Sequence, residues 1–553
     1  MKRVLLIFSL LISAGIVMAQ PAWVKKATKS VFTLKTFAQD GSLIASSNGF
    51  FTGVNGEAVS NYTPFKGATR AVVIDVMGKE MPVVSIMGVN DMYDVVKFRV
   101  DGKTQPLVLA SSVAPINSNA WLLPYHEVKT LKNGPIRKAE LFQADYAYYT
   151  VAMTMPENTI SCPLLNDAGE VIGMMQQPAS ARDTLSYAVS ARFADSLKIS
   201  GFAMNETSLL LTQIKKELPD DIHEATVALY LASSQQDSAS YAVLIDDFIR
   251  KFPNAADGYT YRAQFEAGNY DFDGAEKDME TAIKLAQNKN DVHYAYARII
   301  YNKEVYQSDK EYPGWTLDKA LSEISVAVKE NPLPTYRQVE ANILYAQQKY
   351  AKAYDIYIDL TKSEIRSAEV FYSAAKCKEM EKDTIAMLAL MDSTLSTFSK
   401  PYLKEAAPYL WARAQARMDA RRYREAISDM NDYEQLMVAT INDNFYHIRH
   451  QAEIEGRLFQ QALNDISRAI QINPQETFYY AEKASLEVRV GLYDDAMKTA
   501  QESIEINPED SDGYLFLGLT QCLKGNKKEG LPNLQKAKDM GNTQAEALIE
   551  KYQ

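Results

Sequence analysis

The chain has 553 residues, of which 47% are hydrophobic and 23% are charged, and its formal net charge is -11. A chain of this length exceeds what one hydrophobic core organises, so at least two domains are expected. The acidic balance argues against nucleic acid as a partner, because binding phosphates requires a basic surface.

Residues 1–19 are expected to be an export signal. Lys2 and Arg3 make a positive start, the apolar stretch over residues 4–17 is too short to cross a bilayer, and Ala19 offers a small residue for cleavage. We therefore expect a periplasmic or secreted protein that keeps no integral membrane segment after cleavage. The alternative is an uncleaved anchor.

Residues 20–200 are expected to form an all-β domain. Segments such as 71–74 and 171–174 are rich in β-branched residues, and turn signals such as Asn55-Gly56 separate them. Many short strands at close spacing are typical of a β-barrel or a β-sandwich.

Two motifs in this half resemble HtrA-type trypsin-like serine proteases. Residues 47–63 read SNGFFTGVNGEAVSNYT, similar to the Gly-rich strand, the turn and the Thr-Asn-x-His segment of those enzymes. The resemblance places Thr63 where the family has its catalytic His. Residues 94–100 resemble the strand that begins at the catalytic Asp, which places Asp94 at that position. The fold implied for this half is a trypsin-like double β-barrel.

The nucleophile motif of the family, Gly-Asn-Ser-Gly-Gly-Pro-Leu, aligns with residues 158–164. Pro163 and the hairpin ending at Gly173 set the register, which places Ile160 where the family has its nucleophilic Ser. Gly residues in this loop hold the oxyanion-hole amides of the family. Here a side chain at Asn158 or Cys162 is expected to disfavour positive φ.

The chemistry of acyl transfer leads us to predict a pseudoprotease with no catalytic residues. The reaction needs an oxygen or sulfur nucleophile and a base that accepts its proton. Ile160 has no heteroatom, and the Thr63 hydroxyl is no base near neutral pH. Asp94 then has no imidazole to orient.

Neighbouring side chains leave an alternative open, an active serine or cysteine endopeptidase with a rearranged site. Ser161 and Cys162 follow the nucleophile position and could attack if the loop shifted against Pro163. His126 is the one histidine of this half and would have to act as the base, from a loop after a different strand.

Residues 210–553 are expected to be an all-α solenoid of about nine helix pairs, after a linker at 201–209. The spacing resembles tetratricopeptide repeats. Pairs of like residues lie 34 residues apart: Ala462 and Ala496, Pro474 and Pro508, and Gly491 and Gly525. An insertion is expected near residues 302–315. Unrelated amphipathic helices are the alternative, but they would not repeat one spacing.

The resemblance to tetratricopeptide repeats implies that a protein or peptide partner binds to first-helix residues that face the concave side. By position these are Gln338, Asn342, Tyr372, Lys376, Trp411, Gln415, His447 and Gln451. Trp411 is the expected hot spot, because an inward tryptophan beside polar groups suits one. Some family members grip a C-terminal carboxylate with Lys and Asn, but Gln338 stands where that Lys would be. The alternative is a solvated groove without a ligand.

No metal and no cofactor are expected. Cys162, Cys377 and Cys522 lie far apart and are interpreted as small buried thiols rather than a disulfide framework. His447 and His450 are spaced for a shared metal, but no further ligand type completes a set. The sequence contains no phosphate loop, dinucleotide motif or zinc motif.

Three functional hypotheses follow. The first is an exported protein-binding scaffold that combines an inactive trypsin-like domain with a repeat array. The second is the active endopeptidase, with the repeats recruiting substrate. In the third, the barrel is a structural cap that shields the first helix pair, because repeat arrays need polar caps at their ends.

Overall fold

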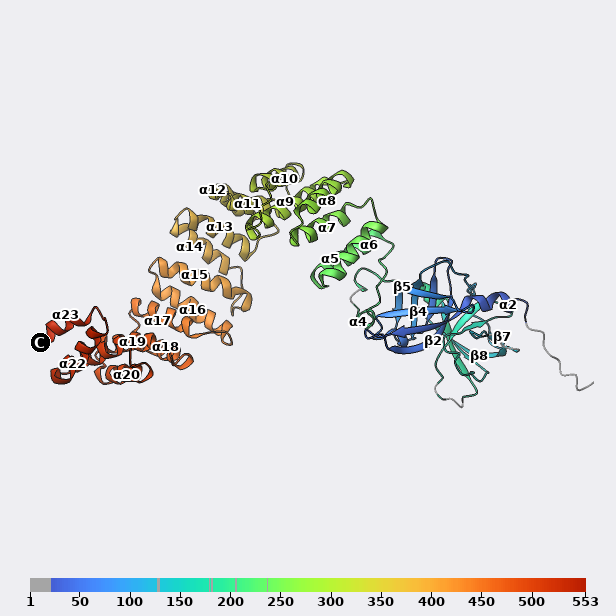
Figure 1. Ribbon diagram of the computed structural model, residues 1–553. Helices are drawn as coiled ribbons and strands as arrows, with labels where there is room; N and C mark the ends of the chain where they lie inside the picture. The colour runs from blue at the N-terminus through green and yellow to red at the C-terminus, as the bar shows by residue number, and fades with distance from the viewer. Residues whose placement is uncertain (1–20, 127–129, 179, 181–182, 204–205, 236) are drawn as a thin grey trace, which may run out of the picture. The chain divides into compact units, whose positions relative to one another are not determined.

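The computed structural model describes residues 21–126, 130–178, 180, 183–203, 206–235 and 237–553 (Figure 1). The export signal predicted at 1–19 lies outside these residues. The chain divides into two compact units, Met1–Ala286 and Gln287–Gln553. In the part of the chain that is described, every helix is too short or too polar to span a membrane.

The first unit begins with a closed six-stranded antiparallel barrel, in the order β1-β2-β3-β6-β5-β4. Its strands are β1 (Val31–Phe37), β2 (Leu43–Phe51), β3 (Glu57–Ser60), β4 (Arg70–Asp75), β5 (Glu80–Asn90) and β6 (Val95–Val100). Buried and half-buried residues alternate along most of β6, as expected for a strand with one face on the core. Phe32, Phe51 and Phe98 pack together inside the barrel.

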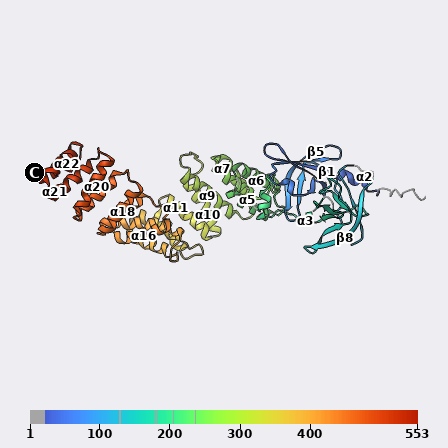
Figure 2. The same cartoon turned by 90° about the horizontal axis from the view of Figure 1, so that it is seen from below.

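A second closed barrel follows, in the order β10-β11-β12-β9-β8-β7. Its strands are β7 (Asn119–Leu122), β8 (Lys132–Phe142), β9 (Tyr146–Val151), β10 (Pro163–Leu165), β11 (Val171–Met175) and β12 (Ser186–Ser190). Figure 2 shows β1 and β5 of the first barrel and β8 of the second from below. The short helices of this region are α2 (Val24–Ala27), η1 (Thr28–Ser30), η2 (Thr63–Phe65), α3 (Phe193–Ser196) and α4 (Thr207–Leu210).

The connection after the barrels packs on the first barrel. The Ile86 N–H donates to the Lys215 carbonyl at 2.7 Å, and the Glu217 N–H donates to the Ile86 carbonyl at 2.8 Å. Leu209, in the predicted linker at 201–209, is buried in the core of that barrel. Apolar side chains of this segment bury themselves on the barrel, as the short connection allows.

Two helix pairs complete the first unit, α5 (Ile222–Gln235) with α6 (Ser238–Lys251) and α7 (Ala256–Gly268) with α8 (Phe272–Leu285). Leu229 of α5 and Phe248 of α6 belong to the same buried cluster as Phe98 of β6. Both views place α5 and α6 beside the barrels (Figures 1 and 2). The first barrel and the first helix pair thus share one core.

The second unit is helical. Its helices are α9 (Lys289–Tyr306), α10 (Leu317–Glu330), α11 (Pro334–Ala346), α12 (Tyr350–Leu360), α13 (Ala368–Met380), α14 (Thr384–Leu395), η4 (Lys404–Ala406), α15 (Ala407–Asp419), α16 (Tyr423–Met437), α17 (Asp443–Glu455), α18 (Phe459–Ile472), α19 (Thr477–Arg489), α20 (Tyr493–Ile506), α21 (Ser511–Leu523), α22 (Lys527–Asp539) and α23 (Ala545–Tyr552). The connection between α9 and α10 spans residues 307–316, in the region where an insertion was expected near 302–315, and α9 stays helical to Tyr306.

The same turn joins the two helices of many pairs. One residue between them has positive φ, which ends the first helix in a left-handed conformation. The series is Tyr270, Gln348, Lys382, Arg421, Arg457, Gly491 and Gly525, with φ between 58° and 86°. Gly491 and Gly525 suit this conformation best, because glycine has no Cβ to clash. The recurring turn shows that the pairs are copies of one local structure.

An ion pair also recurs between the helices of a pair. Arg262 bonds Asp278, Arg413 bonds Asp429 and Arg449 bonds Asp465, each through two guanidinium–carboxylate hydrogen bonds. These three Arg–Asp bridges give the alignment of the repeats. With the two closed barrels, the stacked helix pairs confirm the predicted fold class, a trypsin-like double β-barrel followed by an all-α solenoid.

Candidate functional site

The structure brings together the residues at the base and acid positions of the trypsin-like motif. Thr63 begins η2, and its backbone N–H donates to Asp94 Oδ1 at 2.6 Å. The Thr63 hydroxyl donates to the same oxygen at 2.8 Å. Asp94 itself has φ 48°, a conformation that Asp adopts more readily than most residues. The Asp94 carboxylate therefore holds the start of η2. It accepts a hydrogen bond from the Thr63 hydroxyl at the position where the family's Asp accepts one from the catalytic His.

The loop between β9 and β10 carries the nucleophile position. Ile160 is half-buried there, and its side chain offers no atom that could attack a carbonyl. Asn158 has φ 58° and Ser161 has φ 63°. Asn158 adopts positive φ although a side chain there was expected to disfavour it, because Asn tolerates the left-handed region better than most residues.

Asn48, on β2 of the first barrel, ties this loop across the two barrels. Its side-chain Nδ2 donates to the Asn158 carbonyl at 2.9 Å and to the Ile160 carbonyl at 3.1 Å. The Asn48 side chain is mostly buried, so these bonds are shielded from water. Sequence reasoning missed Asn48 because a strand pattern does not show which loop of the other barrel its side chain will contact.

Ser161, one of the two alternative nucleophiles, has no exposed surface. Its hydroxyl donates to Asn61 Oδ1 at 2.9 Å and accepts from the Asn61 N–H at 3.0 Å. Asn61 Oδ1 also accepts from the Ser47 hydroxyl at 2.5 Å. An amide oxygen is a poor base, so Asn61 positions the hydroxyl and does not activate it.

Cys162 points into the core of the second barrel, where it is completely buried. Burial raises the pKa of its thiol to about 12, so the reactive thiolate is scarce near neutral pH. His126 is exposed on the loop after β7. Among the described residues, it forms no hydrogen bond with Ser161 or Cys162.

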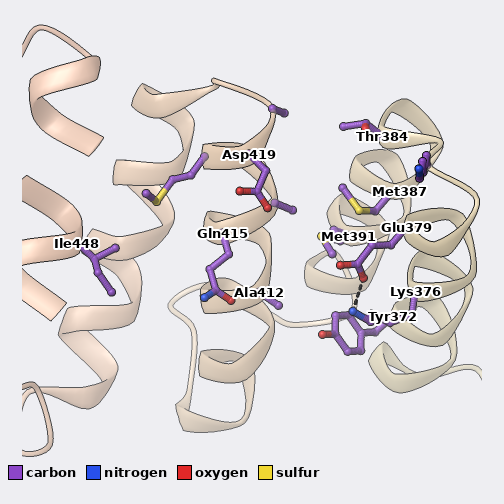
Figure 3. A pocket seen from close by; sticks show the side chains of 14 residues that line it. Tyr372, Lys376, Glu379, Thr384, Met387, Met391, Ala412, Gln415, Asp419 and Ile448 are labelled. Atoms are coloured by element: carbon purple, nitrogen blue, oxygen red, sulfur yellow. Dashed lines mark ion pairs between the residues drawn. The ribbon is translucent and has the colours of Figure 1, made fainter. Parts of the chain in front are cut away.

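The helical unit contains a cleft of about 600 Å³ between α13–α14 and α15, called here the α14–α15 cleft (Figure 3). Of the sequence-predicted binding residues, Tyr372, Lys376 and Gln415 line it. Figure 3 shows Met387, Met391 and Glu379 on one side and Ala412, Gln415 and Asp419 on the other. A volume of this size falls within the usual range for ligand sites, about 300–1,000 Å³.

The other predicted binding residues do not line this cleft. Trp411 packs against Tyr433 and Phe445, with ring centroids 5.3 and 5.8 Å away, so its ring is used in packing between helices. Asn342 Oδ1 accepts the Tyr357 hydroxyl at 2.6 Å. Gln338 is half-buried on α11.

His447 and Gln451 lie further along the array, on α17. The His447 ring packs on Phe478 and Tyr479, and burial lowers its pKa below the ordinary value for histidine. Gln451 Nε2 lies 3.1 Å from His447 Nε2. Within the part of the chain that the structure describes, no three His, Cys, Asp or Glu side chains are grouped to hold a metal ion.

Sequence reasoning missed the methionines of the cleft. Met387 and Met391 are almost fully buried on α14, and Met418 of α15 also contributes to the lining. The helical period predicts that these methionines are core residues, which is the usual role of a methionine on the apolar face of a helix.

No protein-family model and no curated protein matches the chain. Among solved structures, the crystal structure of the active form of the Rv3671c protease from M. tuberculosis is similar to part of it. The two are 17% identical, the match covers 33% of this chain and 85% of that chain, and the TM-score is 0.29. The fold assignment made above rests on the strand order of the two barrels.

Proposed function

We propose that this protein is an exported protein-binding scaffold. Its N-terminal half is a trypsin-like domain without catalytic activity, and its C-terminal half is a tetratricopeptide-repeat array that binds a protein or peptide partner. The mature chain begins near Gln20. N-terminal sequencing of the protein recovered from the periplasm or the medium tests the export step, and a chain that retains Met1 would contradict it.

The observation that carries the loss of catalysis is the state of Ser161. With Ile160 at the nucleophile position, Ser161 is a neighbouring hydroxyl, and both hydrogen bonds of that hydroxyl go to Asn61 in a buried site. Thr63 replaces the base and bonds Asp94. A triad that lacks its members loses on the order of 10⁴–10⁶ in rate, so peptide hydrolysis is not expected.

A peptidase assay on the mature chain tests this proposal. The substrates are unfolded casein and a fluorogenic peptide library, and the controls are Ser161→Ala and Cys162→Ala. We expect no turnover above the rate of the controls. Turnover that either substitution abolishes would overturn the proposal and favour the alternative, an active endopeptidase with a rearranged site.

The recurring left-handed turn and the Arg–Asp bridges support the repeat-array half of the proposal, because each recurs at equivalent positions of several helix pairs. Stacked pairs of this kind offer an extended surface to partners. Crosslinking in the native compartment, followed by mass spectrometry of captured partners, tests whether the array binds protein. Crosslinks that map only to the barrels would contradict this role.

A second role for the barrels, a structural cap, is favoured by one specific observation. Leu229 and Phe248 of the first helix pair are buried in one cluster with Phe98 of the first barrel. Arg99 of that barrel also forms ion pairs with Glu57 and with Glu217 of the connection. The barrel thereby covers an apolar helix face that would otherwise be exposed to water.

A further inference from the structure

His450 of α17 departs from the pattern of the repeats. Counted from the left-handed turn that follows each first helix, its position carries a small residue in the other pairs of that series: Ala263, Ala341, Ala375, Ala414, Ala484 and Gly518. These small residues are buried, and His450 has no exposed surface either. An imidazole ring therefore occupies a tightly packed position, where a polar group costs free energy unless it is hydrogen-bonded.

Glu482 of α19 is a second departure. Counted from the same turn, its position carries uncharged residues in the other pairs: Tyr261, Val339, Ser373, Ala412, Ile448 and Phe516. Its carboxylate Oε2 lies 3.6 Å from Nε2 of His450. Two residues that depart from the repeat pattern, in adjacent helix pairs, therefore meet in space, which points to a role that they share.

The surroundings of the ring determine which nitrogen carries its first proton. Nδ1 of His450 lies 2.8 Å from the Ala462 carbonyl oxygen of α18. A carbonyl oxygen can only accept, so Nδ1 donates and carries the proton of the neutral ring. Nε2 of the neutral ring is then a lone pair. This atom is buried and has no hydrogen-bond partner among the described residues.

A second proton changes the contact with Glu482. In the neutral ring, the lone pair of Nε2 faces a carboxylate oxygen, which also has only lone pairs. Once Nε2 takes up a proton from solvent, it becomes a cationic N–H donor directed at that carboxylate. The ring then bonds α18 through Nδ1 and α19 through Nε2, and so joins two successive helix pairs.

Most of the other charged side chains on the elements around the ring are paired with one another. Arg449, the preceding residue, forms ion pairs with Asp465 and Glu434, on the two helices α18 and α16. Lys483 Nζ, on α19, lies 3.7 Å from Glu487 Oε1. These pairs leave one carboxylate, the partner described above, against Nε2.

Three further titratable groups lie close to the two residues: His447 and Glu453, each about one turn away on α17, and Asp512 of α21. Burial lowers the pKa of His447, whose ring centroid is 6.3 Å from that of His450. Burial raises the pKa of Asp512, which also interacts with the charge of Glu482. Burial raises the pKa of Glu453 to about 8, so its titration has to be removed before the effect of His450 is measured.

We propose that His450 and Glu482 form a proton-dependent latch between the pair α17–α18 and the pair α19–α20. The latch is closed when Nε2 carries a proton and donates it to Glu482 Oε2. It opens as the pH rises and the proton leaves, because the lone pair and the carboxylate then repel each other. The array is thus held more firmly at this junction in mildly acidic solution than above neutral pH, whether or not a partner is bound.

The first test observes the protons of the ring by NMR, on the full mature chain labelled with nitrogen-15 in its histidines. The chain has five histidines, so single His→Gln substitutions assign the signals. We expect a proton on Nδ1 alone at about pH 9 and on both nitrogens at about pH 5, because histidine changes charge between about pH 5 and 8. A neutral ring with its proton on Nε2, or a ring that gains no second proton by about pH 5, would overturn the proposal.

The second test measures how firmly the junction is held, by hydrogen exchange and mass spectrometry at about pH 5 and about pH 9, corrected for the intrinsic effect of pH on exchange. The parent chain carries Glu453→Gln, so that Glu453 no longer titrates. We expect the amides of α19 to be protected at least about tenfold more at the lower pH, because a charge-assisted hydrogen bond is gained there.

Two variants of this parent remove the latch by different routes. Glu482→Gln replaces the charge by an amide that can donate to the bare Nε2, and His450→Ala restores the residue that other repeats carry. Each should abolish the difference in protection between the two pH values. Glu505→Gln, at an exposed glutamate of α20, is the matched control and should keep the difference. A difference that persists in either latch variant would overturn the proposal.

Discussion

Ser161 and Asn61 exchange two hydrogen bonds across the two barrels: the hydroxyl of Ser161 donates to Asn61 Oδ1 at 2.9 Å and accepts the Asn61 N–H at 3.0 Å. Both residues are buried. The pair links the loop that would carry a nucleophile to the segment that would carry a base. In this chain two buried hydrogen bonds hold the two segments together.

Ser161→Ala should therefore destabilise the barrels and leave the measured rate of peptide hydrolysis unchanged. The substitution removes the acceptor of the buried Asn61 N–H, and an unsatisfied buried group costs about 1–3 kcal/mol. The free energy of unfolding from urea titrations measures the effect. Ser112→Ala, at an exposed serine of the same half, should change stability little. If Ser161→Ala lowered the free energy of unfolding as little as Ser112→Ala does, the structural role of Ser161 would be contradicted.

The Cys162 thiol should not react with a thiol reagent while the protein is folded. Complete burial and a pKa of about 12 keep it protonated and out of reach near pH 8. Labelling by Ellman's reagent, with and without denaturant, measures this directly in a chain whose other two cysteines are replaced by serine. Rapid labelling of the native chain would instead support the cysteine endopeptidase alternative.

Leu229→Ala should destabilise the first barrel and the first helix pair together. Leu229 is fully buried in the core that they share, and truncation of such a leucine costs about 2–5 kcal/mol. Hydrogen exchange followed by mass spectrometry should show faster exchange in both β6 and α5. Tyr230→Ala, at a largely exposed neighbour on α5, is the control. Faster exchange confined to α5 would argue against the cap.

Glu453→Gln should change how stability depends on pH. Glu453 is buried, and burial together with the charge of Asp465 raises the pKa of its carboxyl to about 8. The unfolded value is about 4.3, so the protonated carboxyl favours the folded chain at low pH. That contribution is lost as the pH rises through about 8.

The glutamine variant keeps the neutral side chain at every pH, so its stability should exceed that of the wild type more at pH 9 than at pH 5. Urea titrations at the two pH values measure the difference. Glu455→Gln, at an exposed glutamate on the same helix, should leave the pH dependence as it is in the wild type. If Glu453→Gln left the change in unfolding free energy between the two pH values as it is in the wild type, the Glu453 carboxyl would not be the group that causes this pH dependence.

The sequence by itself determined an all-β half followed by a helical repeat array, because period-two strands and a fixed 34-residue spacing are local properties of the chain. The resemblance to trypsin-like proteases then specified a double barrel for the β half. The same resemblance assigned Thr63 and Asp94 to the base and acid positions of one site, and the structure joins them by a hydrogen bond. The identity of Ile160 was enough to exclude the usual nucleophile, because an aliphatic side chain has no atom that can attack.

Only the tertiary structure decided what surrounds those positions. That Asn48 reaches the loop at Asn158, that Cys162 points into the barrel core and that Leu209 buries itself on the first barrel depend on segments distant in sequence. The role of Trp411 was decided in the same way, by packing against Tyr433 and Phe445. A pattern shows which face of an element is apolar, but the neighbour that covers this face is set by how the elements pack together.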